Sequence, residues 1–569
     1  MLTAKEGGRD SFMSNEGRQL GPIDFRTNAD RYRHWRVDID GDVARVTLDV
    51  APEGGQSHEY QLKLNSYDLS VDIELYDITQ RLRFGHPEVG AVVLTGGPER
   101  VFCAGANIQM LAGSTHEHKV NFCKFTNETR LGIEDATEVS HQTWIAAVNG
   151  TAAGGGYELA LACEEIVLVD DRSSVVSLPE LPLLAVLPGT GGLSRVIDKR
   201  HVRRDLADLF ATRAEGVKGD QALSWGLVDL LAAPSIFEET VRTRASEAAA
   251  RSDRPGGPGV TLNPLTREIG GPRISYSSLD VEFDRSLSVA HFHVRGPAHD
   301  EPASGAQLLE KGDSAWILRL CREIDDAVLH LRFNEPEIAT WVFHSSGDPS
   351  AVLAVEDVLD SHSAHWLVRE IRAYWKRTFK RLDTSARTVV TLVEPGSCFA
   401  GTLAELVLAA DRSFIFDGSP GEGLDPPPSL TLTSANQTHF PMGNGLSRLE
   451  ARYWGHDDDL RTVVELTGKP LSGEECASLG LVTFALDELD WDDEVRMTLE
   501  ERSSFSPDAL TGMEANLRFV GPETMESKIF GRLSTWQNWI FLRPNASGPD
   551  GALRRYGTGS RPTYDRKRV

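Results

Sequence analysis

The sequence lacks any long apolar run, and its basic residues are outnumbered by acidic ones. No stretch approaches the roughly 18 consecutive apolar residues that a membrane-spanning helix needs, and the N-terminal residues lack the apolar core of a signal peptide. Lys and Arg number 59 against 84 Asp and Glu, giving a net charge of −25, which disfavours binding to nucleic acid. We expect a soluble, cytoplasmic protein with no membrane or nucleic-acid partner, in which local basic groups can still bind an anionic ligand.

Cysteine is scarce, and the spacing of cysteine and histidine does not fit a metal site. The 6 cysteines form no Cys-x-x-Cys pair, and the 16 histidines form no His-Glu-x-x-His sequence. We predict reduced, partly buried thiols and no bound metal.

Glycine and proline cluster near the middle of the chain. Residues 252–259 read Ser-Asp-Arg-Pro-Gly-Gly-Pro-Gly, which is typical of a linker. With 569 residues, 40% of them apolar, the chain is long enough for several domains. The predicted divisions are a flexible N-terminus (1–27), a first domain (28–252), a linker (253–275), a second domain (276–490) and a helical C-terminal segment with a tail (491–569).

The two predicted domains are copies of one module. Four segments recur in the same order, each about 250 residues further along the chain. The matched pairs are 82–89 with 331–338, 158–164 with 405–411, 188–195 with 441–448, and 226–228 with 480–482. Both copies alternate apolar strand-like runs with helix-like segments. The sequence therefore predicts an α/β fold made of tandem modules.

A triple glycine in the first copy runs directly into an apolar, helix-like segment. Residues 154–156 are glycines, and Tyr157 and Glu158 follow at once. Glycine amides can face a cavity freely, and the start of a helix adds a positive dipole end there. A second carboxylate, Glu180, follows a rigid proline and can face the same cavity. The pattern predicts a site that stabilises an oxyanion and moves protons.

These motifs resemble the crotonase (enoyl-CoA hydratase/isomerase) superfamily. The segments that carry the resemblance are FCAGANIQML (102–111), NGTAAGGGYELALACEE (149–165), LPEL (178–181) and PGTGGLSR (188–195). The resemblance covers residues 35–230 strongly and 275–490 as a degenerate copy. It implies two ββα-spiral modules in tandem.

The resemblance also implies roles for single residues. The amides of Ala106 and Gly155 would hold the thioester carbonyl of an acyl-CoA, and Glu158 and Glu180 occupy the two catalytic carboxylate positions. The loop residues expected to bind coenzyme A are Ala104, Asn107 and Ile108. Coenzyme A is then part of the substrate, and no further cofactor is required. Which glutamate activates water stays open, as does whether Tyr157 shapes the acyl pocket or packs in the core.

The chain as a whole is similar to a narrower family, the 2,3-epoxybenzoyl-CoA dihydrolases or benzoyl-CoA-dihydrodiol lyases. The likeness rests on size, on the tandem halves and on the segment WQNWIFLRP (536–544). It implies ring opening of 2,3-epoxy-2,3-dihydrobenzoyl-CoA with two waters, giving 3,4-dehydroadipyl-CoA semialdehyde and formate in aerobic benzoate degradation.

Two other functions stay open. One is an enoyl-CoA hydratase or isomerase acting on another acyl-CoA, which would use the same motifs. The other is a non-catalytic acyl-CoA-binding protein, which the presence of both Glu158 and Glu180 disfavours.

Because modules of this kind usually trimerise, their tandem fusion suggests a different assembly, and we expect a homodimer.

Three departures from the superfamily pattern matter. Asn107 replaces a frequent aspartate, and the loop 51–60 is longer than usual, which leaves the first contacts to coenzyme A open. In the second copy the triple glycine is lost before Glu405, and Thr433 matches the position of Glu180. We therefore predict that the second copy is structural rather than catalytic.

Overall fold

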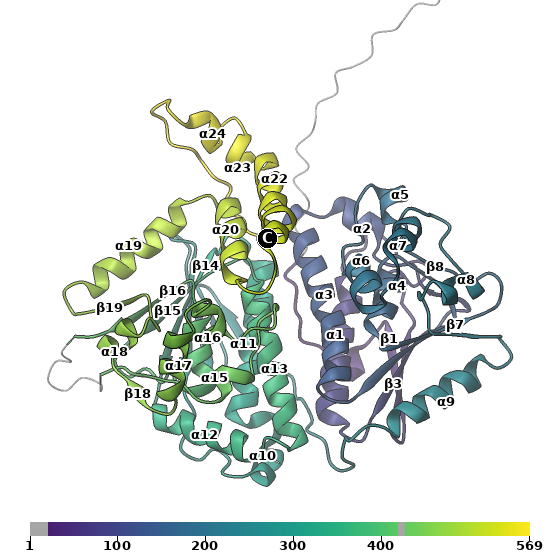
Figure 1. The fold of residues 1–569 in the computed structure, drawn as a ribbon, viewed down its shortest axis with the longest axis horizontal. Helices are drawn as coiled ribbons and strands as arrows, with labels where there is room; N and C mark the ends of the chain where they lie inside the picture. The colour runs from purple at the N-terminus through teal and green to yellow at the C-terminus, as the bar shows by residue number, and fades with distance from the viewer. Residues whose placement is uncertain (1–20, 419–426) are drawn as a thin grey trace, which may run out of the picture.

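The structure is a computed structural model that describes residues 21–418 and 427–569. Two α/β halves lie side by side, and a helical C-terminal segment rises near their junction (Figure 1). The predicted tandem α/β organisation is confirmed. Residues 1–20 of the predicted flexible N-terminus lie outside the described residues.

The first half contains a sheet of order β1-β2-β3-β5-β7-β9. Its strands are β1 (Trp35–Asp40), β2 (Val43–Leu48), β3 (Ala91–Gly96), β5 (Thr143–Val148), β7 (Glu165–Val169) and β9 (Leu230–Ala232). β1 and β2 form an antiparallel hairpin, and the pairs from β2 onward are parallel. All residues of β3 are buried, as expected for a parallel strand covered on both faces.

A smaller parallel sheet carries the loops of the candidate site. It joins β4 (Arg100–Cys103), β6 (Gly150–Ala153) and β8 (Val176–Ser177). β4 and β6 overlap the first residues of the motif segments 102–111 and 149–165, and β8 ends just before the segment 178–181. The carboxyl ends of neighbouring parallel strands meet at one edge, so this sheet gathers segments that are distant in sequence.

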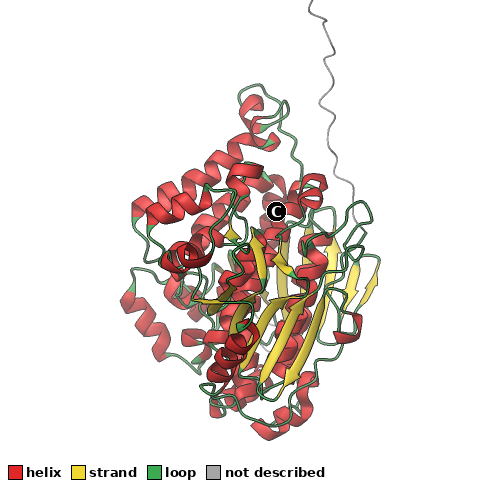
Figure 2. Cartoon of the chain, turned by 90° about the vertical axis from the view of Figure 1, so that its right-hand side faces the viewer, coloured by secondary structure: helices red, strands yellow, loops and turns green. Residues whose placement is uncertain are grey.

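Helices cover both faces of the larger sheet (Figure 2). α9 (Phe237–Ala249) packs on one face, and α1 (Leu69–Gly85) and α3 (His116–Glu138) pack on the other. The remaining helices of this half are α2 (Ile108–Gly113), α4 (Gly155–Ala162), α5 (Glu180–Leu184), α6 (Gly192–Ser194), α7 (Arg204–Ala211) and α8 (Gly219–Ser224).

The second half repeats this plan with a longer sheet, of order β10-β11-β12-β13-β14-β15-β16-β19. The strands are β10 (Glu268–Gly270), β11 (Arg273–Ser275), β12 (Leu279–Asp284), β13 (Val289–Arg295), β14 (Thr340–Ser346), β15 (Thr388–Val393), β16 (Arg412–Phe416) and β19 (Phe484–Leu486). The predicted linker (253–275) therefore includes β10 and β11. Those strands pair onto β12, and Ile274 is fully buried, so the second module starts earlier than the glycine and proline pattern suggested.

The helices of the second half match those of the first in order. α11 (Trp316–Asn334) and α13 (Trp366–Asp383) cover the inner face of the sheet, and α19 (Trp491–Ser504) packs on the outer face. The others are α10 (Gly305–Lys311), α12 (Pro349–Ser361), α14 (Ala404–Leu408), α15 (Ala435–Thr438), α16 (Arg448–Arg452), α17 (Asp457–Glu465) and α18 (Gly473–Ser478), with a small sheet of β17 (Leu430–Thr431) and β18 (Pro470–Leu471).

Buried ion pairs join the two halves where α1 and α3 meet α11 and α13 (Figure 1). The carboxylate of Glu128 on α3 accepts hydrogen bonds from Arg332, at 2.6 Å, and from Arg381, at 2.8 Å. Burial alone would raise the pKa of Glu128, but the two guanidinium groups hold it below its usual value. Removing one partner of such a buried pair costs about 3–5 kcal/mol, so the halves form one structural unit.

The chain before residue 28 is packed where it is described. Ile23 and Phe25 are buried, and the Ile23 amide donates to Asn334 Oδ1 at 2.7 Å. The Phe25 ring lies 5.0 Å from the rings of both Phe125 and Phe333. The prediction of flexibility up to residue 27 is therefore wrong for this part, because these two apolar side chains fill the seam between the halves.

The C-terminal segment begins on the second half and then projects away from it. α20 (Pro507–Arg518) is anchored by Glu514, whose carboxylate binds the buried Arg568 at 2.6 Å. The helices that follow are α21 (Met525–Lys528), α22 (Ser534–Leu542), α23 (Pro544–Ser547) and α24 (Ala552–Arg555), and α22 to α24 stand clear of both sheets (Figure 1).

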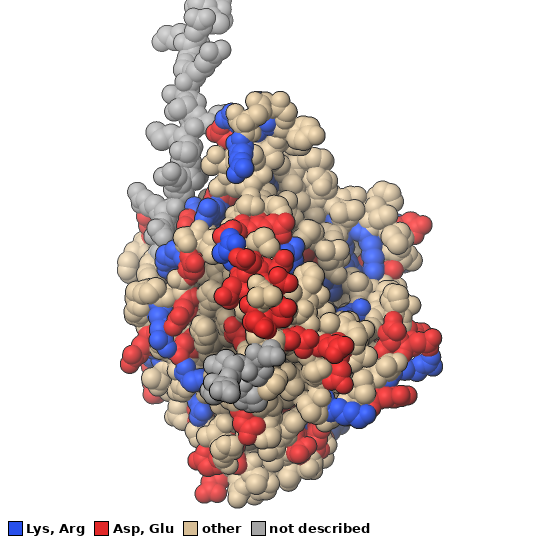
Figure 3. All heavy atoms as spheres, turned by 90° about the vertical axis from the view of Figure 1, so that its left-hand side faces the viewer, with Lys and Arg blue, Asp and Glu red and all other residues tan. Residues whose placement is uncertain are grey.

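Acidic side chains gather on the outer side of the second half (Figure 3). In this half Asp457–Asp459 in α17 and Asp492 and Asp493 in α19 are exposed. A surface of this charge repels an anionic ligand. None of the described helices is long and apolar enough to cross a membrane.

Candidate active site

Two glycine turns approach each other closely at the edge of the small sheet. Gly154 precedes α4 with φ of 52°, and Gly105 has φ of 87°, a backbone region that side chains disfavour. A β-carbon built on Gly105 would lie 2.9 Å from the amide nitrogen of Gly155. The structure therefore places the loop of Ala106 directly beside the start of α4.

The amides of Ala106 and Gly155 are available as donors. Neither N–H has an acceptor among residues 21–418 and 427–569. Gly155 occupies the first turn of α4, where amides have no partner inside the helix. The loop of Ala106 is fixed by Tyr67, whose amide donates to Gly105 O at 3.0 Å and whose carbonyl accepts from Asn107 N at 2.8 Å. The predicted oxyanion donors are thus neighbours in space.

Glu158 is buried and held by a glycine-rich turn. Its Oε1 accepts from Thr190 N at 3.0 Å and from Gly192 N at 2.7 Å, and its Oε2 accepts from the Thr190 hydroxyl. A β-carbon on Gly192 would lie 2.9 Å from this carboxylate. The motif of residues 188–195 therefore serves to orient Glu158.

Glu180 has a different environment. It is the first residue of α5, and its Oε2 is buried without a hydrogen-bond partner in the described parts of the chain. Its Oε1 would lie 2.5 Å from a β-carbon on Gly154, so the carboxylate lies over the glycine turn. Burial, together with the negative charge of Glu158, raises the pKa of Glu180 to about 7. A carboxyl group with that pKa exchanges protons near neutral pH.

An open cleft of about 520 Å³ lies beside the loop of Ala106. Its lining includes Ala104, Ala106, Asn107 and Ile108. The long loop 51–60 supplies the other wall through Glu53, His58, Glu59 and Tyr60, and Lys63 adds a positive charge. The predicted coenzyme A residues therefore share one surface groove.

Asn107 contributes to this cleft mainly by shaping it. Its side-chain amide donates to Gln61 O at 2.9 Å, and its Oδ1 accepts from Met110 N at 2.9 Å as the N-cap of α2. Ile108, by contrast, is 55% exposed and can pack against a flat ring.

Tyr157 lies in the core and is not part of the lining of the 520 Å³ cleft. Its ring is fully buried and packs edge-on against Phe210 at 5.6 Å, and its hydroxyl donates to Leu227 O at 2.7 Å. These contacts favour the packing interpretation over the acyl-pocket interpretation, because the core encloses the ring and the hydroxyl already has an acceptor.

Three side chains at the site were not singled out from the sequence. Thr190 donates hydrogen bonds to Glu158. The motif that contains Thr190 recurs in the second copy, and this recurrence could have identified the residue from the sequence. The Sγ of Cys123, on α3, would lie 3.1 Å from a β-carbon built on Gly189. Burial and the negative charge of Glu158 raise the pKa of this thiol to about 11. Tyr67 reaches Gly155 from a distant part of the sequence, and no local pattern indicates this contact.

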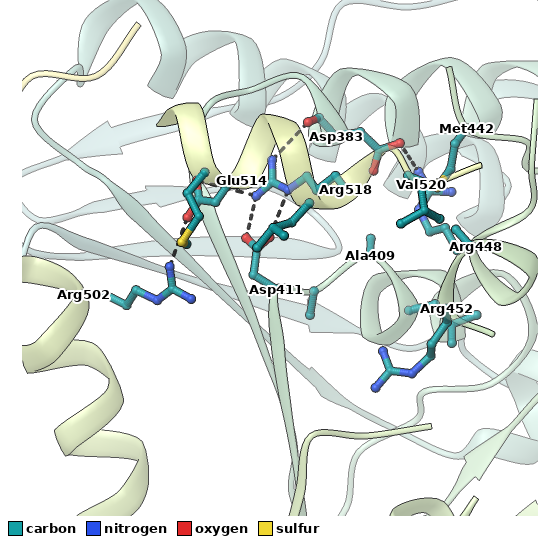
Figure 4. A pocket seen from close by; sticks show the side chains of 15 residues that line it. Asp383, Ala409, Asp411, Met442, Arg448, Arg452, Arg502, Glu514, Arg518 and Val520 are labelled. Carbon is teal, nitrogen blue, oxygen red and sulfur yellow. Dashed lines mark hydrogen bonds and ion pairs between the residues drawn. The ribbon is translucent and has the colours of Figure 1, made fainter. Parts of the chain in front are cut away.

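The second copy does not keep the same arrangement. Glu405 accepts from Asn436 at 2.9 Å and is paired with Arg448 at 3.0 Å, and Figure 4 shows Arg448 next to Asp383, which it binds at 2.6 Å. Thr433, which matches Glu180, offers no carboxylate. A cavity of about 240 Å³ beside this region is lined by charged side chains that pair with each other (Figure 4).

No metal centre accompanies these residues. Across residues 21–418 and 427–569, no group of three or more His, Cys, Asp or Glu side chains could hold a metal ion.

Comparison with known proteins relates the chain to acyl-CoA enzymes. Residues 61–254 match the enoyl-CoA hydratase/isomerase family. The fatty acid oxidation complex subunit alpha of Shewanella loihica is 30% identical over 218 residues, which are 38% of this chain and 28% of that protein. An enoyl-CoA hydratase of Bacillus anthracis of known structure is 28% identical over 38% of this chain and 77% of its own, with a TM-score of 0.33.

One relative matches almost end to end. The benzoyl-CoA-dihydrodiol lyase of Aromatoleum evansii is 50% identical over 548 residues, which are 96% of this chain and 98% of that protein. The match therefore includes both halves and the C-terminal segment. The chain belongs to the benzoyl-CoA-dihydrodiol lyase family, within the crotonase superfamily.

Proposed function

We propose that this protein opens the ring of 2,3-epoxy-2,3-dihydrobenzoyl-CoA with two waters, releasing formate and 3,4-dehydroadipyl-CoA semialdehyde. The end-to-end likeness to a benzoyl-CoA-dihydrodiol lyase supports the substrate class. The geometric observation that carries the chemistry is the position of the Glu180 carboxylate, whose Oε2 has no hydrogen-bond partner among the described residues, over the turn that presents the free amide of Gly155.

In this proposal the two amides act on the thioester. The oxygen of the thioester accepts from Ala106 N–H and Gly155 N–H, and these donors stabilise the enolate-like charge that forms when the ring is attacked. Losing one donor of such a pair typically raises the barrier by ~3 kcal/mol.

The two glutamates take different parts. Glu180 moves protons, because its pKa of about 7 lets it both accept and donate near neutral pH. Glu158 is fixed by three hydrogen bonds from Thr190 and Gly192, so its remaining lone pairs can hold and orient a water against the ring.

Coenzyme A would lie in the cleft beside Ala104 and Ile108, as part of the substrate. We propose that no other cofactor takes part. A coenzyme A thioester is an intracellular metabolite, which supports a cytoplasmic location for this protein.

We also propose that the protein forms a homodimer through its C-terminal helices. Exposed apolar side chains follow one another there, in the order Met525 (69% exposed), Phe530 (73%), Phe541 (54%) and Leu542 (78%). An apolar surface of this kind on a projecting arm is typical of an interface.

The test is product analysis with 2,3-epoxy-2,3-dihydrobenzoyl-CoA. We expect mass spectrometry to detect formate and a ring-opened thioester in equal amounts. Crotonyl-CoA, assayed in parallel, tests the hydratase alternative. The match of residues 61–254 to the enoyl-CoA hydratase/isomerase family supports that alternative. Hydration of crotonyl-CoA without formate release from the epoxide would reject the ring-opening function.

A further inference from the structure

Tyr67 places a hydroxyl group beside the amide donors. Its backbone pairs with the strand-like segment of Gly105 to Asn107, so it is fixed to the same loop as Ala106. Its ring then crosses to α4, where a β-carbon built on Gly155 would lie 2.0 Å from the hydroxyl oxygen. The hydroxyl therefore approaches one donor from the loop that carries the other.

This hydroxyl has no hydrogen-bond partner within the described parts of the chain, although the side chain is only 2% exposed. The groups nearest its ring are a guanidinium and a second aromatic ring. The guanidinium of Arg130 lies 5.2 Å from the ring centroid and is bound to Asp72, and the ring of Phe122 lies at 6.1 Å. Native proteins rarely leave a buried hydroxyl unpaired, and such an exception needs an explanation.

The protonation state of Tyr67 is also fixed. Burial raises its pKa well above 10, and the charges of Asp72 and Glu158 add to this effect while Arg130 opposes it. The hydroxyl therefore keeps its proton at neutral pH and can act as a donor.

Unsatisfied polar groups gather around one point. The amides of Ala106 and Gly155, the Tyr67 hydroxyl and Glu180 Oε2 all lack partners among the described residues, and all lie around Gly154 and Gly155. A single bound acyl group would satisfy them together.

We infer that the Tyr67 hydroxyl is a third donor to the thioester oxygen of the substrate, alongside the amides of Ala106 and Gly155. This assignment rests on the proposed acyl-CoA chemistry and adds a substrate-contacting side chain to it. The same closeness accounts for glycine at position 155, because any side chain there would displace the Tyr67 ring.

The variant Tyr67→Phe removes the hydroxyl and keeps the ring. Turnover should fall by about tenfold to a hundredfold, since one transition-state donor is lost. The melting temperature should stay equal or rise, because the variant removes a buried polar atom that had no partner. Tyr453→Phe is the matched control: its hydroxyl donates to Leu479 O at 2.7 Å in the second half, so this variant should melt lower and keep its turnover.

The discriminating measurement is difference infrared spectroscopy of benzoyl-CoA labelled with ¹³C at the thioester carbonyl, bound at saturation. Wild type and Tyr453→Phe should lower the carbonyl frequency to the same extent, and Tyr67→Phe should lower it less. An identical band in Tyr67→Phe and wild type, or a clear loss of stability in Tyr67→Phe, would overturn the inference. If the protein binds crotonyl-CoA but not benzoyl-CoA, the ring assignment fails, and the same band shift read in labelled crotonyl-CoA still decides the role of Tyr67.

Discussion

The carboxylate of Glu180 lies over the α-carbon of Gly154, so close that a β-carbon there would be 2.5 Å from Oε1. The proposed proton-transfer residue and the turn that precedes the amide of Gly155 therefore fit each other only because position 154 is glycine. In the proposed mechanism this one contact joins the acid–base group to the oxyanion donors.

Glu158→Gln and Glu180→Gln should each lower turnover by at least about a hundredfold, because each removes a carboxylate from proton transfer or water activation. The measurement is formate release under saturating substrate, with circular dichroism to confirm folding. Glu164→Gln, at an exposed position two residues beyond the end of α4, should behave as wild type. A folded Glu180→Gln variant with near-normal turnover would remove Glu180 from the mechanism.

The pH dependence of turnover should show a limb near pH 7 that belongs to Glu180, whose pKa is raised to about 7 by burial and by the charge of Glu158. Glu323 in the second half also has a pKa of about 7 from burial, so Glu323→Gln is the control and should leave the limb in place. Loss of the limb in Glu323→Gln would contradict the assignment.

The same shift predicts how stability depends on pH. An ordinary glutamate ionises near ~4.3, so between that value and about 7 the folded protein keeps a proton that the unfolded chain has lost. The contribution of Glu180 is therefore full at low pH and is lost as the pH rises through 7. Urea unfolding across this range should show a smaller decline for Glu180→Gln than for wild type, and an equal decline would contradict the raised pKa.

Gly155→Ala should abolish activity although it keeps the amide. A β-carbon there would be 2.0 Å from the Tyr67 hydroxyl and 2.8 Å from Cζ, so the ring must move and the oxyanion site is distorted. Gly132→Ala is the matched control, since a β-carbon at that helical position meets nothing within 4 Å, and it should keep activity and gain stability. Full activity of Gly155→Ala would contradict the prediction, because it would mean that the Tyr67 ring can move without distorting the oxyanion site.

Replacing the exposed apolar side chains of the C-terminal helices should dissociate the proposed dimer. The double variant Phe530→Ser and Leu542→Ser should elute with the mass of a monomer in size-exclusion chromatography with light scattering. Leu489, 81% exposed on the second half, provides the control Leu489→Ser, which should remain dimeric. A wild-type protein that is monomeric at micromolar concentration would reject the proposal.

Dialysis against EDTA should leave turnover unchanged, because we propose that the amide donors supply the stabilisation that a metal would otherwise provide. Metal analysis of the purified protein should find less than one equivalent of any transition metal. Loss of activity that added zinc or magnesium restores would contradict this prediction.

Much of the site could be predicted because its parts are local patterns. In three places the residue types of a short segment determine its backbone conformation. These are the glycines before Glu158, the proline before Glu180 and the loop of Ala106. The fold followed from the recurrence of those patterns and from the apolar runs that became β3, β5, β14 and β15.

Other features were beyond a reading of local pattern. Tyr157 lies within a motif and packs in the core, whereas Tyr67 lies outside every motif and its hydroxyl reaches Gly155. Sequence spacing does not fix which way a ring turns once a helix is docked. The same holds for Ile23 and Phe25, whose burial depends on a surface supplied by the second half.

The sequence by itself determined the module, its duplication and the choice of Glu158 and Glu180, since backbone geometry and residue chemistry at those positions are set locally. Only the tertiary structure decided how the two carboxylates differ. Glu158 is held by the turn of Thr190 and Gly192, whereas Glu180 is partly buried and its Oε2 has no partner among the described residues. The pKa of a carboxyl group depends on burial and on neighbouring charge, and both come from residues that are distant along the chain.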